Sequence, residues 1–463
     1  MMKVEKVPLL SIIFFFLSSL FLTFSLFLSH NTSFSLSIIF VLLIISGLFS
    51  LKFAGYSVLS IPIVFSVFFL LFVGGRFGGC LVSSFNGALC PSNYAELFYQ
   101  SRMVNYSINL DKADFLYFFV CLWFFCFVFG SLVFSLFFKL HEKTPQLKFA
   151  KPNFSKITIA KHALFVSLIV LFCIRGGDIL TVIKGGYLAL YTRGDESFYA
   201  SLLKTIFTTL FMFSVAYLIA SEEQVPFLKI LFIIAILDLF VGQRGAFFSK
   251  LIIILISSRK VQDISVTRAL FFSMILFFAL NLFMSFSLRG NSEADDSLGV
   301  VSLISTLLYS QGTTLGVMSF SIFEVSEVPT RLAIKSFIPF TNTIYTIFGD
   351  DILFHERSIG QFISYMANPA AYKNGGGLGS SILSESYIIF GYYGSLLFSL
   401  VLGLGAFLVE YKKKKSKYIK YLWVTVMFVT PMLPRSGITN LMIPIIISIV
   451  IYSFYRISLR KVN

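Results

Sequence analysis

Apolar runs of about twenty residues recur along this chain and are separated by short polar segments. Each run is long enough, as a helix, to cross roughly 30 Å of hydrocarbon. Ten such runs lie at 8–29, 33–52, 55–74, 113–138, 159–175, 201–220, 267–288, 386–410, 419–434 and 437–456. A helix satisfies its own backbone polar groups inside a membrane, so the pattern predicts an all-α polytopic membrane protein. We expect residues 1–463 to form a single integral membrane domain with about ten full spans.

An eleventh apolar run, 228–258, is interrupted near its middle by the sequence Gly242-Gln243-Arg244-Gly245. Each half has about fourteen residues, or roughly 21 Å as a helix, which is short for a full crossing. The run therefore either crosses twice as two short helices or re-enters from one face. We favour two short crossings, which bring Arg244 towards the outer side and give about 11–12 crossings in total.

Basic residues set the orientation of the spans, because Lys and Arg concentrate in cytoplasmic loops. Lysines gather before the first run, in segment 139–161 and in segment 412–420, and the chain ends in a basic tail. Counting the spans between these segments places both termini in the cytoplasm.

Three segments then fall on the outer, non-cytoplasmic side, at 75–112, 176–200 and 289–385. The last is a large loop of nearly a hundred residues. Within it, 299–323 and 336–348 are moderately apolar, and Ser, Thr and Gln interrupt both. We expect surface-lying or re-entrant helices at these two places.

Composition agrees with a membrane protein and argues against other classes. The chain is 57% hydrophobic and 13% charged, and its mean hydropathy is +0.87. The net charge of +15 does not indicate a nucleic-acid partner, because the basic residues flank apolar runs rather than forming a stripe with stacking aromatics. The five cysteines are too scattered for a metal cluster, although Cys80 and Cys90 share an outer loop and could form a disulfide in an oxidising compartment.

Arginine and lysine are distributed differently across the membrane. Nine of the thirteen arginines fall on the outer side in this topology, whereas the lysines concentrate on the inner side. The rigid fork of donors on arginine suits phosphate and carboxylate groups, while lysine is a hydrated point charge. The asymmetry indicates that the protein handles an anion on its outer side.

Five of these arginines lie near the outer ends of predicted spans: Arg175, Arg193, Arg244, Arg289 and Arg435. Each could instead reach towards the lipid headgroups, as long basic side chains do. Arg244 is the strongest candidate for an anion site, because a helix broken at membrane depth is tolerated mainly where it lines a cavity. Asp238, six residues earlier, is expected to pair with a basic residue in a structural role.

Two further segments carry candidate chemistry. The Gly-rich stretch 375–395 places Glu385 near a membrane entry, where it is a candidate base or a capping carboxylate. His355, Glu356 and Arg357 form a compact polar cluster in the large outer loop, which is either a solvated group of loop charges, the interpretation we favour, or a source of a base in His355. The chain contains no GxxxxGK[ST] or HExxH motif, and Asp350-Asp351 is an adjacent pair rather than a spaced DxD.

At these residues the chain resembles the O-antigen polymerases (Wzy-type oligosaccharide repeat-unit polymerases) of bacterial inner membranes. The matching features are GQRG at 242–245, Arg193 in YTRGD, the block GGGLGSSILSESYIIFGYYG at 375–394 and the large late loop. Arg175 followed by Gly186 also fits an Arg-x10-Gly spacing of some members. Arg289 is followed by Gly299, one position short of that spacing, which weakens the case for carrying over the family's two-loop substrate handling.

The resemblance implies a glycosyltransferase with a GT-C-like fold that works on the periplasmic face without metal or cofactor. Its donor and acceptor would be oligosaccharide units linked to undecaprenyl pyrophosphate, and a chain-length regulator is a possible further partner. Arg244 and Arg289 are expected as pyrophosphate clamps, with Arg175, Arg193 and Arg435 binding substrate and Glu385 or His355 as the base.

Two other classes fit part of the pattern. A polysaccharide-to-lipid-A ligase would share the fold and the chemistry. A lipid-linked oligosaccharide flippase or another transporter would share the spans and the anionic cargo, but we expect it to lack so large an outer loop.

Overall fold

The computed structural model describes residues 9–10, 12–20, 32–83, 90–99, 103–136, 154–185, 187–190, 198–257, 300–325, 328–338, 341, 348 and 353–460. Every regular element of three residues or more within these ranges is helical, as the apolar runs predict. The chain is therefore an all-helical, polytopic membrane protein.

The first third of the chain contributes the helices α2 (Ser33–Phe53), α3 (Ile61–Phe72), α4 (Gly75–Ser83), η1 (Tyr94–Phe98), α5 (Leu110–Val133) and η2 (Phe134–Leu136). The middle contributes α6 (Phe154–Gly185), η3 (Tyr187–Leu190), α7 (Phe198–Ala220), α8 (Leu228–Phe240) and α9 (Arg244–Ser257). Short helices follow: α11 (Val300–Gln311), α12 (Thr314–Glu324), α13 (Thr330–Phe337), η5 (Phe354–Arg357), α15 (Ile359–Ala367) and α16 (Pro369–Lys373). The last elements are α17 (Ile382–Lys412), α18 (Lys417–Val429), η6 (Thr430–Arg435) and α19 (Ile438–Arg460).

Among the described residues, fewer long spans are present than the ten predicted for the whole chain. Five helices (α2, α5, α6, α7 and α17) are long and apolar enough to cross a membrane, and the bent pair α3 and α4 makes up to six. The predicted span 267–288 lies outside the described residues, and 8–29 is described only at 9–10 and 12–20, where it is helical. The predicted span 419–434 stops being α-helical at Val429, because Pro431 and Pro434 lack the backbone N–H that an α-helix needs.

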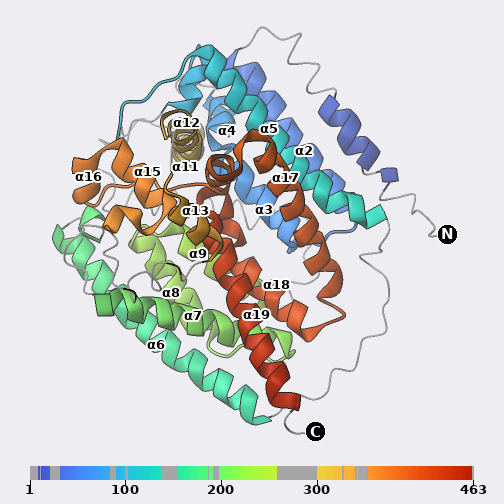
Figure 1. The fold of residues 1–463 in the computed structure, drawn as a ribbon, viewed down its shortest axis with the longest axis vertical. Helices are drawn as coiled ribbons and strands as arrows, with labels where there is room; N and C mark the ends of the chain where they lie inside the picture. Colours follow the sequence, from blue (N-terminus) through green and yellow to red (C-terminus); the bar gives the residue numbers. More distant parts are fainter. Residues whose placement is uncertain are drawn as a thin grey trace.

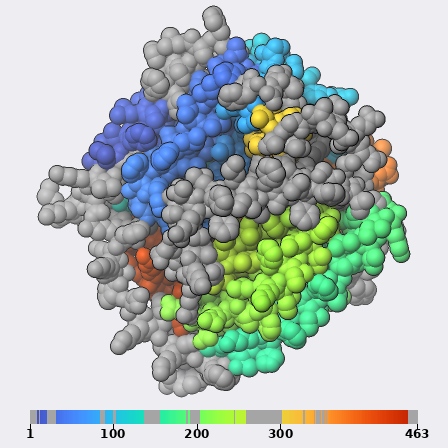
Figure 2. All heavy atoms as spheres, turned by 180° about the vertical axis from the view of Figure 1, so that it is seen from behind, coloured from blue at the N-terminus to red at the C-terminus, as the bar shows by residue number. Residues whose placement is uncertain are grey.

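Two groups of helices make up the molecule. One contains α2–α5 and α17, and the other contains α6–α9 with α18 packed against α7 and α9. In Figure 1, α6–α9 lie to the left of α19, and α2–α5 and α17 lie above it and to its right. Figure 2, from behind, shows α2–α4 in blue and α6–α9 in green over separate areas of that face. The short helix η6 touches α3 and α17 of the first group and α9 and α18 of the second, and it also touches α19.

Glycines bring α5 and α17 into close contact. A Cβ at Gly130 would collide with the backbone of Leu400, and one at Gly403 would collide with the backbone of Phe127. The Ser399 hydroxyl donates to the Trp123 carbonyl at 2.6 Å across the same interface. Small residues allow helices to pack closely in a membrane, where apolar side chains gain little by leaving lipid. This contact therefore joins an early helix to a late one.

Two predicted loop boundaries differ from the structure. Helix α6 continues through Gly176 and Gly177 to Gly185, so the first ten positions of the predicted segment 176–200 are helical. The region 299–323 forms α11 and α12, which are too short to cross a membrane singly. Helix α12 is largely buried, which removes the surface-lying alternative for it. Most of 336–348 lies outside the described residues.

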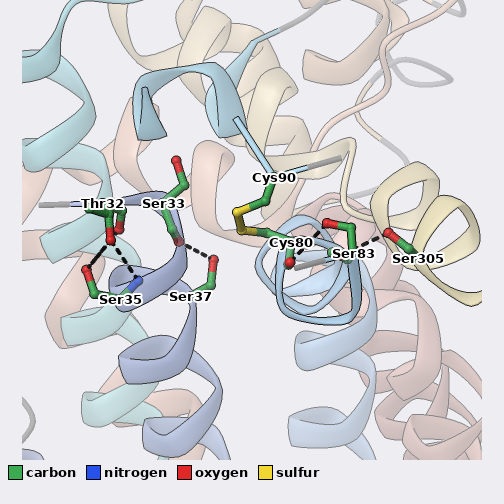
Figure 3. The surroundings of a disulfide bond; sticks show 9 residues. Thr32, Ser33, Ser35, Ser37, Cys80, Ser83, Cys90 and Ser305 are labelled. Carbon is green, nitrogen blue, oxygen red and sulfur yellow. Dashed lines mark hydrogen bonds between the residues drawn. A yellow bond between two sulfur atoms is a disulfide. The ribbon is translucent and has the colours of Figure 1, made fainter. Parts of the chain in front are cut away.

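The predicted disulfide between Cys80 and Cys90 is present (Figure 3). It ties the last turn of α4 to the chain that leads into η1. Nearby, the Ser305 hydroxyl of α11 donates to the Gly79 carbonyl of α4 at 2.9 Å, as Figure 3 also shows. Arg76 is buried and donates to the carbonyls of Leu97 and Tyr99, so it serves to join α4 to η1.

Candidate functional site

The predicted break in the run 228–258 is confirmed, and its local chemistry explains it. Helix α8 ends at Phe240, and Gly242 adopts a φ of 79°, a conformation that glycine adopts without strain. The Gln243 amide donates to the Asp238 carbonyl at 2.7 Å, and the Gly242 amide donates to the Leu239 carbonyl at 2.8 Å. These two bonds form a Schellman motif, which closes the helix, and α9 begins immediately afterwards at Arg244. The side chain of Arg244 lies outside the described residues.

The break rests on η6. A Cβ at Gly245 would overlap the side chain of Met432, so the glycine lets η6 approach the break this closely. Arg435 ends η6, and its guanidinium carbon lies 5.7 Å from the centre of the Phe72 ring at the end of α3. The backbone of the GQRG segment and the element that carries Arg435 are therefore neighbours, although they are almost two hundred positions apart in the sequence.

Glu385 reaches the same junction from α17. Ser381 caps α17 by accepting a hydrogen bond from the Ser384 amide. Glu385 lies in the first turn, is 3% exposed, and accepts a hydrogen bond from the Ile438 amide at 2.7 Å through Oε2. Its carboxylate occupies the space that a Cβ at Gly437 would need. Glu385 therefore caps the N-terminus of α19, where a negative charge is favoured.

A buried ion cluster lies on the other side of the break. Asp238, in the last turn of α8, is fully buried and accepts a hydrogen bond from the Lys250 ammonium of α9. Arg175 of α6 places its Nε atom 2.6 Å from the other Asp238 carboxylate oxygen. The same guanidinium donates to Asp178 at 2.6 Å. The expectation that Asp238 pairs with a basic residue is therefore confirmed.

His355 lies in a separate polar cluster on η5. Its ring stacks on Tyr365 of α15 with a centroid distance of 3.9 Å. Burial, and then the Arg331 guanidinium, lower the pKa of His355 below the usual 6.5. Arg331 forms an ion pair with Glu356, and the Lys335 ammonium donates to the carbonyl of Arg357. These contacts join η5 to α13 and α15.

The structure thus places the predicted site residues unevenly. Arg175 contacts Asp238 just before the GQRG break, Arg435 lies on η6, which touches the break, and Glu385 binds the start of α19. His355 belongs to the cluster of η5, α13 and α15, and Arg193 and Arg289 lie outside the described residues.

Lys250 is the functional candidate that sequence reasoning missed. It is 6% exposed, although it stands in an apolar run that reads as a plain membrane helix. A lone lysine twelve positions after a lone aspartate, in the two halves of a broken helix, was the available signal. Within the described ranges, no group of three or more His, Cys, Asp or Glu residues is placed to hold a metal ion.

Comparison with known families settles the class of protein. The chain matches the family described as O-antigen polysaccharide polymerase Wzy over residues 10–461, and it therefore belongs to that family. The resemblance inferred from the GQRG segment and the Gly-rich block is confirmed. No curated protein and no solved structure matches the chain. As a family member, it is a multi-pass membrane enzyme that polymerises lipid-linked repeat units.

Proposed function

We propose that this Wzy family member polymerises oligosaccharide units carried on undecaprenyl pyrophosphate at the periplasmic face of the bacterial inner membrane. It transfers the growing chain onto the incoming unit and so builds an O-antigen or a similar surface polysaccharide. The family match over residues 10–461 carries this proposal.

The proposed topology has both termini in the cytoplasm, a GT-C-like arrangement of about ten full spans with one broken span, and a large periplasmic loop at 289–385. Two features support it. The turn between α17 and α18 is rich in lysine, as a cytoplasmic turn should be. The Cys80–Cys90 disulfide suits an oxidising compartment, as the predicted outer segment 75–112 requires.

The reaction joins a sugar hydroxyl to an anomeric carbon. The hydroxyl oxygen of the incoming unit attacks the anomeric carbon of the growing chain. The bond to the pyrophosphate oxygen breaks, and undecaprenyl pyrophosphate leaves with the bonding electrons. The proton of the hydroxyl passes to a base. Since the donor already carries its leaving group, the reaction needs no nucleotide, metal or other cofactor.

Charge develops on the leaving pyrophosphate, so fixed cations there stabilise the transition state more than the bound substrate. We assign this role to Arg244 and Arg289. The position of Arg244 at the first residue of α9 supports it, because free backbone N–H groups at a helix N-terminus also favour a phosphate.

Arg193 and Arg435 are assigned to binding the second lipid-linked unit. The contact between η6 and the break supports a role for Arg435 beside the reacting groups. Arg175, whose guanidinium already binds two carboxylates, offers no unpaired charge to a substrate.

Two residues are candidates for the base, and we favour His355. Its lowered pKa keeps the imidazole neutral at pH 7, so it can accept a proton. Glu385 is the second candidate, but one of its oxygens already binds the Ile438 amide.

Deleting the gene and separating the surface polysaccharide on a gel tests the function. Loss of a polymerase leaves single-unit caps on lipid A. Loss of a ligase strands polymer on its carrier, and loss of a flippase removes both products, so either of these patterns refutes the proposal.

The arginine roles are tested by complementation with Arg244→Lys and Arg289→Lys, with Arg456→Lys at the chain end as the matched control. We expect each of the first two to reduce polymer formation about 10²–10³-fold, as removal of a charge-stabilising donor commonly does. Retained polymerisation in both would argue against bidentate binding of the pyrophosphate.

A further inference from the structure

The three central residues of the ion cluster beside the break are buried. Asp238 is 0% exposed, Lys250 is 6% exposed and Arg175 is 7% exposed. Removing one partner from such a cluster leaves an uncompensated buried charge, which is strongly unfavourable. The cluster is therefore held as a unit, and it joins α6, α8 and α9, which lie side by side in Figure 1.

The cluster contacts both helices that flank the GQRG segment, through Asp238 of α8 and Lys250 of α9. The carbonyl of Asp238 accepts the Gln243 amide that closes α8, while its carboxylate binds Lys250 on α9. One residue thus fixes both the end of the first half-helix and the approach of the second. The position and direction of the first turn of α9, which begins at Arg244, follow from these contacts.

The charge balance of the cluster argues against direct anion binding. Two cations, Arg175 and Lys250, face two carboxylates, Asp178 and Asp238. The only other cation that contacts it among the described residues is Lys204, which lies 3.9 Å from Asp178 at the partly exposed edge. Since each buried cation is already matched by a carboxylate, the buried part of the cluster offers a phosphate little attraction, but it can hold helices in a fixed arrangement.

We propose that Arg175, Asp238 and Lys250 are positioning residues: their ion cluster sets the geometry of the GQRG break, and Arg175 acts through Asp238 rather than on the substrate. The role of this geometry in polymerisation rests on the proposed function. The control of the break itself does not.

One single and one double substitution test the coupling between the ion cluster and polymerisation. The assay uses purified protein in lipid nanodiscs and undecaprenyl-pyrophosphate-linked units as substrate. Asp238→Asn leaves the Lys250 ammonium without its carboxylate, so we expect kcat to fall at least about tenfold with KM changed less than about twofold. Asp238→Asn combined with Lys250→Met removes both charges, and we expect kcat to recover to within about threefold of the wild type. Lys161→Met, which disrupts an exposed ion pair between α6 and Glu223 in the turn after α7, is the matched control and should change neither constant.

A second measurement follows the break without requiring polymerisation. A single cysteine at Gln243, in a chain whose free Cys121, Cys126 and Cys173 are replaced by alanine, is labelled with a soluble maleimide. We expect Asp238→Asn to change the labelling rate at least about fivefold and the double variant to restore it. A substitution that only lowered the amount of folded protein would reduce the labelled yield and leave this rate unchanged.

Three outcomes overturn the inference. One is a labelling rate that is the same in Asp238→Asn and the wild type. The second is a double variant no better than the single one. The third is Arg175→Gln with a KM raised more than about tenfold at unchanged kcat, which would show direct substrate binding. If the wild type makes no polymer, the proposed function fails, and the labelling result alone still decides whether the cluster controls the break.

Discussion

Glu385 has two proposed roles, as the cap that accepts a hydrogen bond from the Ile438 amide and as a candidate base, and two substitutions can separate them. Glu385→Ala removes the acceptor at the buried N-terminus of α19, where the bond length is 2.7 Å and the side chain is 3% exposed. A buried N–H without a partner costs about 1–3 kcal/mol, and loss of a helix N-cap costs about 1 kcal/mol. These two figures describe the same bond, so we expect the free energy of unfolding to fall by about 2 kcal/mol.

Glu385→Gln keeps an oxygen that can accept from the Ile438 amide but cannot take a proton from a sugar hydroxyl. If His355 is the base, this variant should retain polymerisation within about fivefold and lose less than about 1 kcal/mol of stability. Gly437→Ala is the structural counterpart, because its Cβ would displace the carboxylate, and it should resemble Glu385→Ala.

Thermal unfolding in detergent and polymerisation of lipid-linked units measure the two effects separately. An inactive Glu385→Gln variant with wild-type thermal stability would refute the reasoning, since it would make Glu385 the base and its hydrogen bond secondary.

Three other predictions concern separate parts of the molecule. With His355 as the base, kcat/KM should fall as the pH drops through the pKa of His355, and the midpoint of this fall should lie below pH 6.5. The transition should disappear in His355→Gln. A midpoint above pH 6.5 would contradict the lowering of the pKa by burial and Arg331. Gly403→Leu should destabilise the protein by more than about 3 kcal/mol in thermal unfolding, because the new side chain would meet the Phe127 carbonyl. An unchanged melting temperature would refute that contact. Burial and then Arg357 lower the pKa of Lys335 to about 8. Brief acylation at about pH 8, followed by mass spectrometry, should therefore find Lys335 among the most reactive lysines. A Lys335 that reacts no faster than the average lysine would contradict the lowered pKa.

The sequence predicted the elements whose cause is local. The run lengths gave α2, α5, α7 and α17, and Gly242 marked the end of α8 because a Schellman motif needs a residue at positive φ. The disulfide was predictable as a possibility from two cysteines on one side of the membrane.

Features that depend on distant partners were not predictable in the same way. Gly176 and Gly177 looked like a helix end, yet α6 continues through them. Packing of α6 on α7 and the ion pair from Arg175 to Asp178 offset the cost of about 1 kcal/mol per glycine. Neither a hydrophobic period nor a motif shows which cation Asp238 will bind, because its partners come from two other helices.

The candidate site follows the same rule. The residues gathered around the break were identifiable by type, as arginines and one glutamate at helix ends. The hydrogen bonds and ion pairs that these side chains form depend on how distant helices meet. The bond from the Ile438 amide to Glu385, for example, depends on the contact between α17 and α19. Sequence could nominate these side chains, but it could not say which of them are already occupied.

The close contact between α5 and α17 has a consequence for how the protein is made. The hydrogen bond from Ser399 to Trp123 joins residues 276 positions apart. At about 5–20 residues per second, the ribosome needs roughly half a minute to synthesise the intervening chain. During that interval α5 stands in the bilayer with the face around Gly130 uncovered by its final partner. Membrane insertion factors or neighbouring lipids must occupy that face until α17 arrives, so the interval is the stage at which this polymerase is most exposed to misassembly.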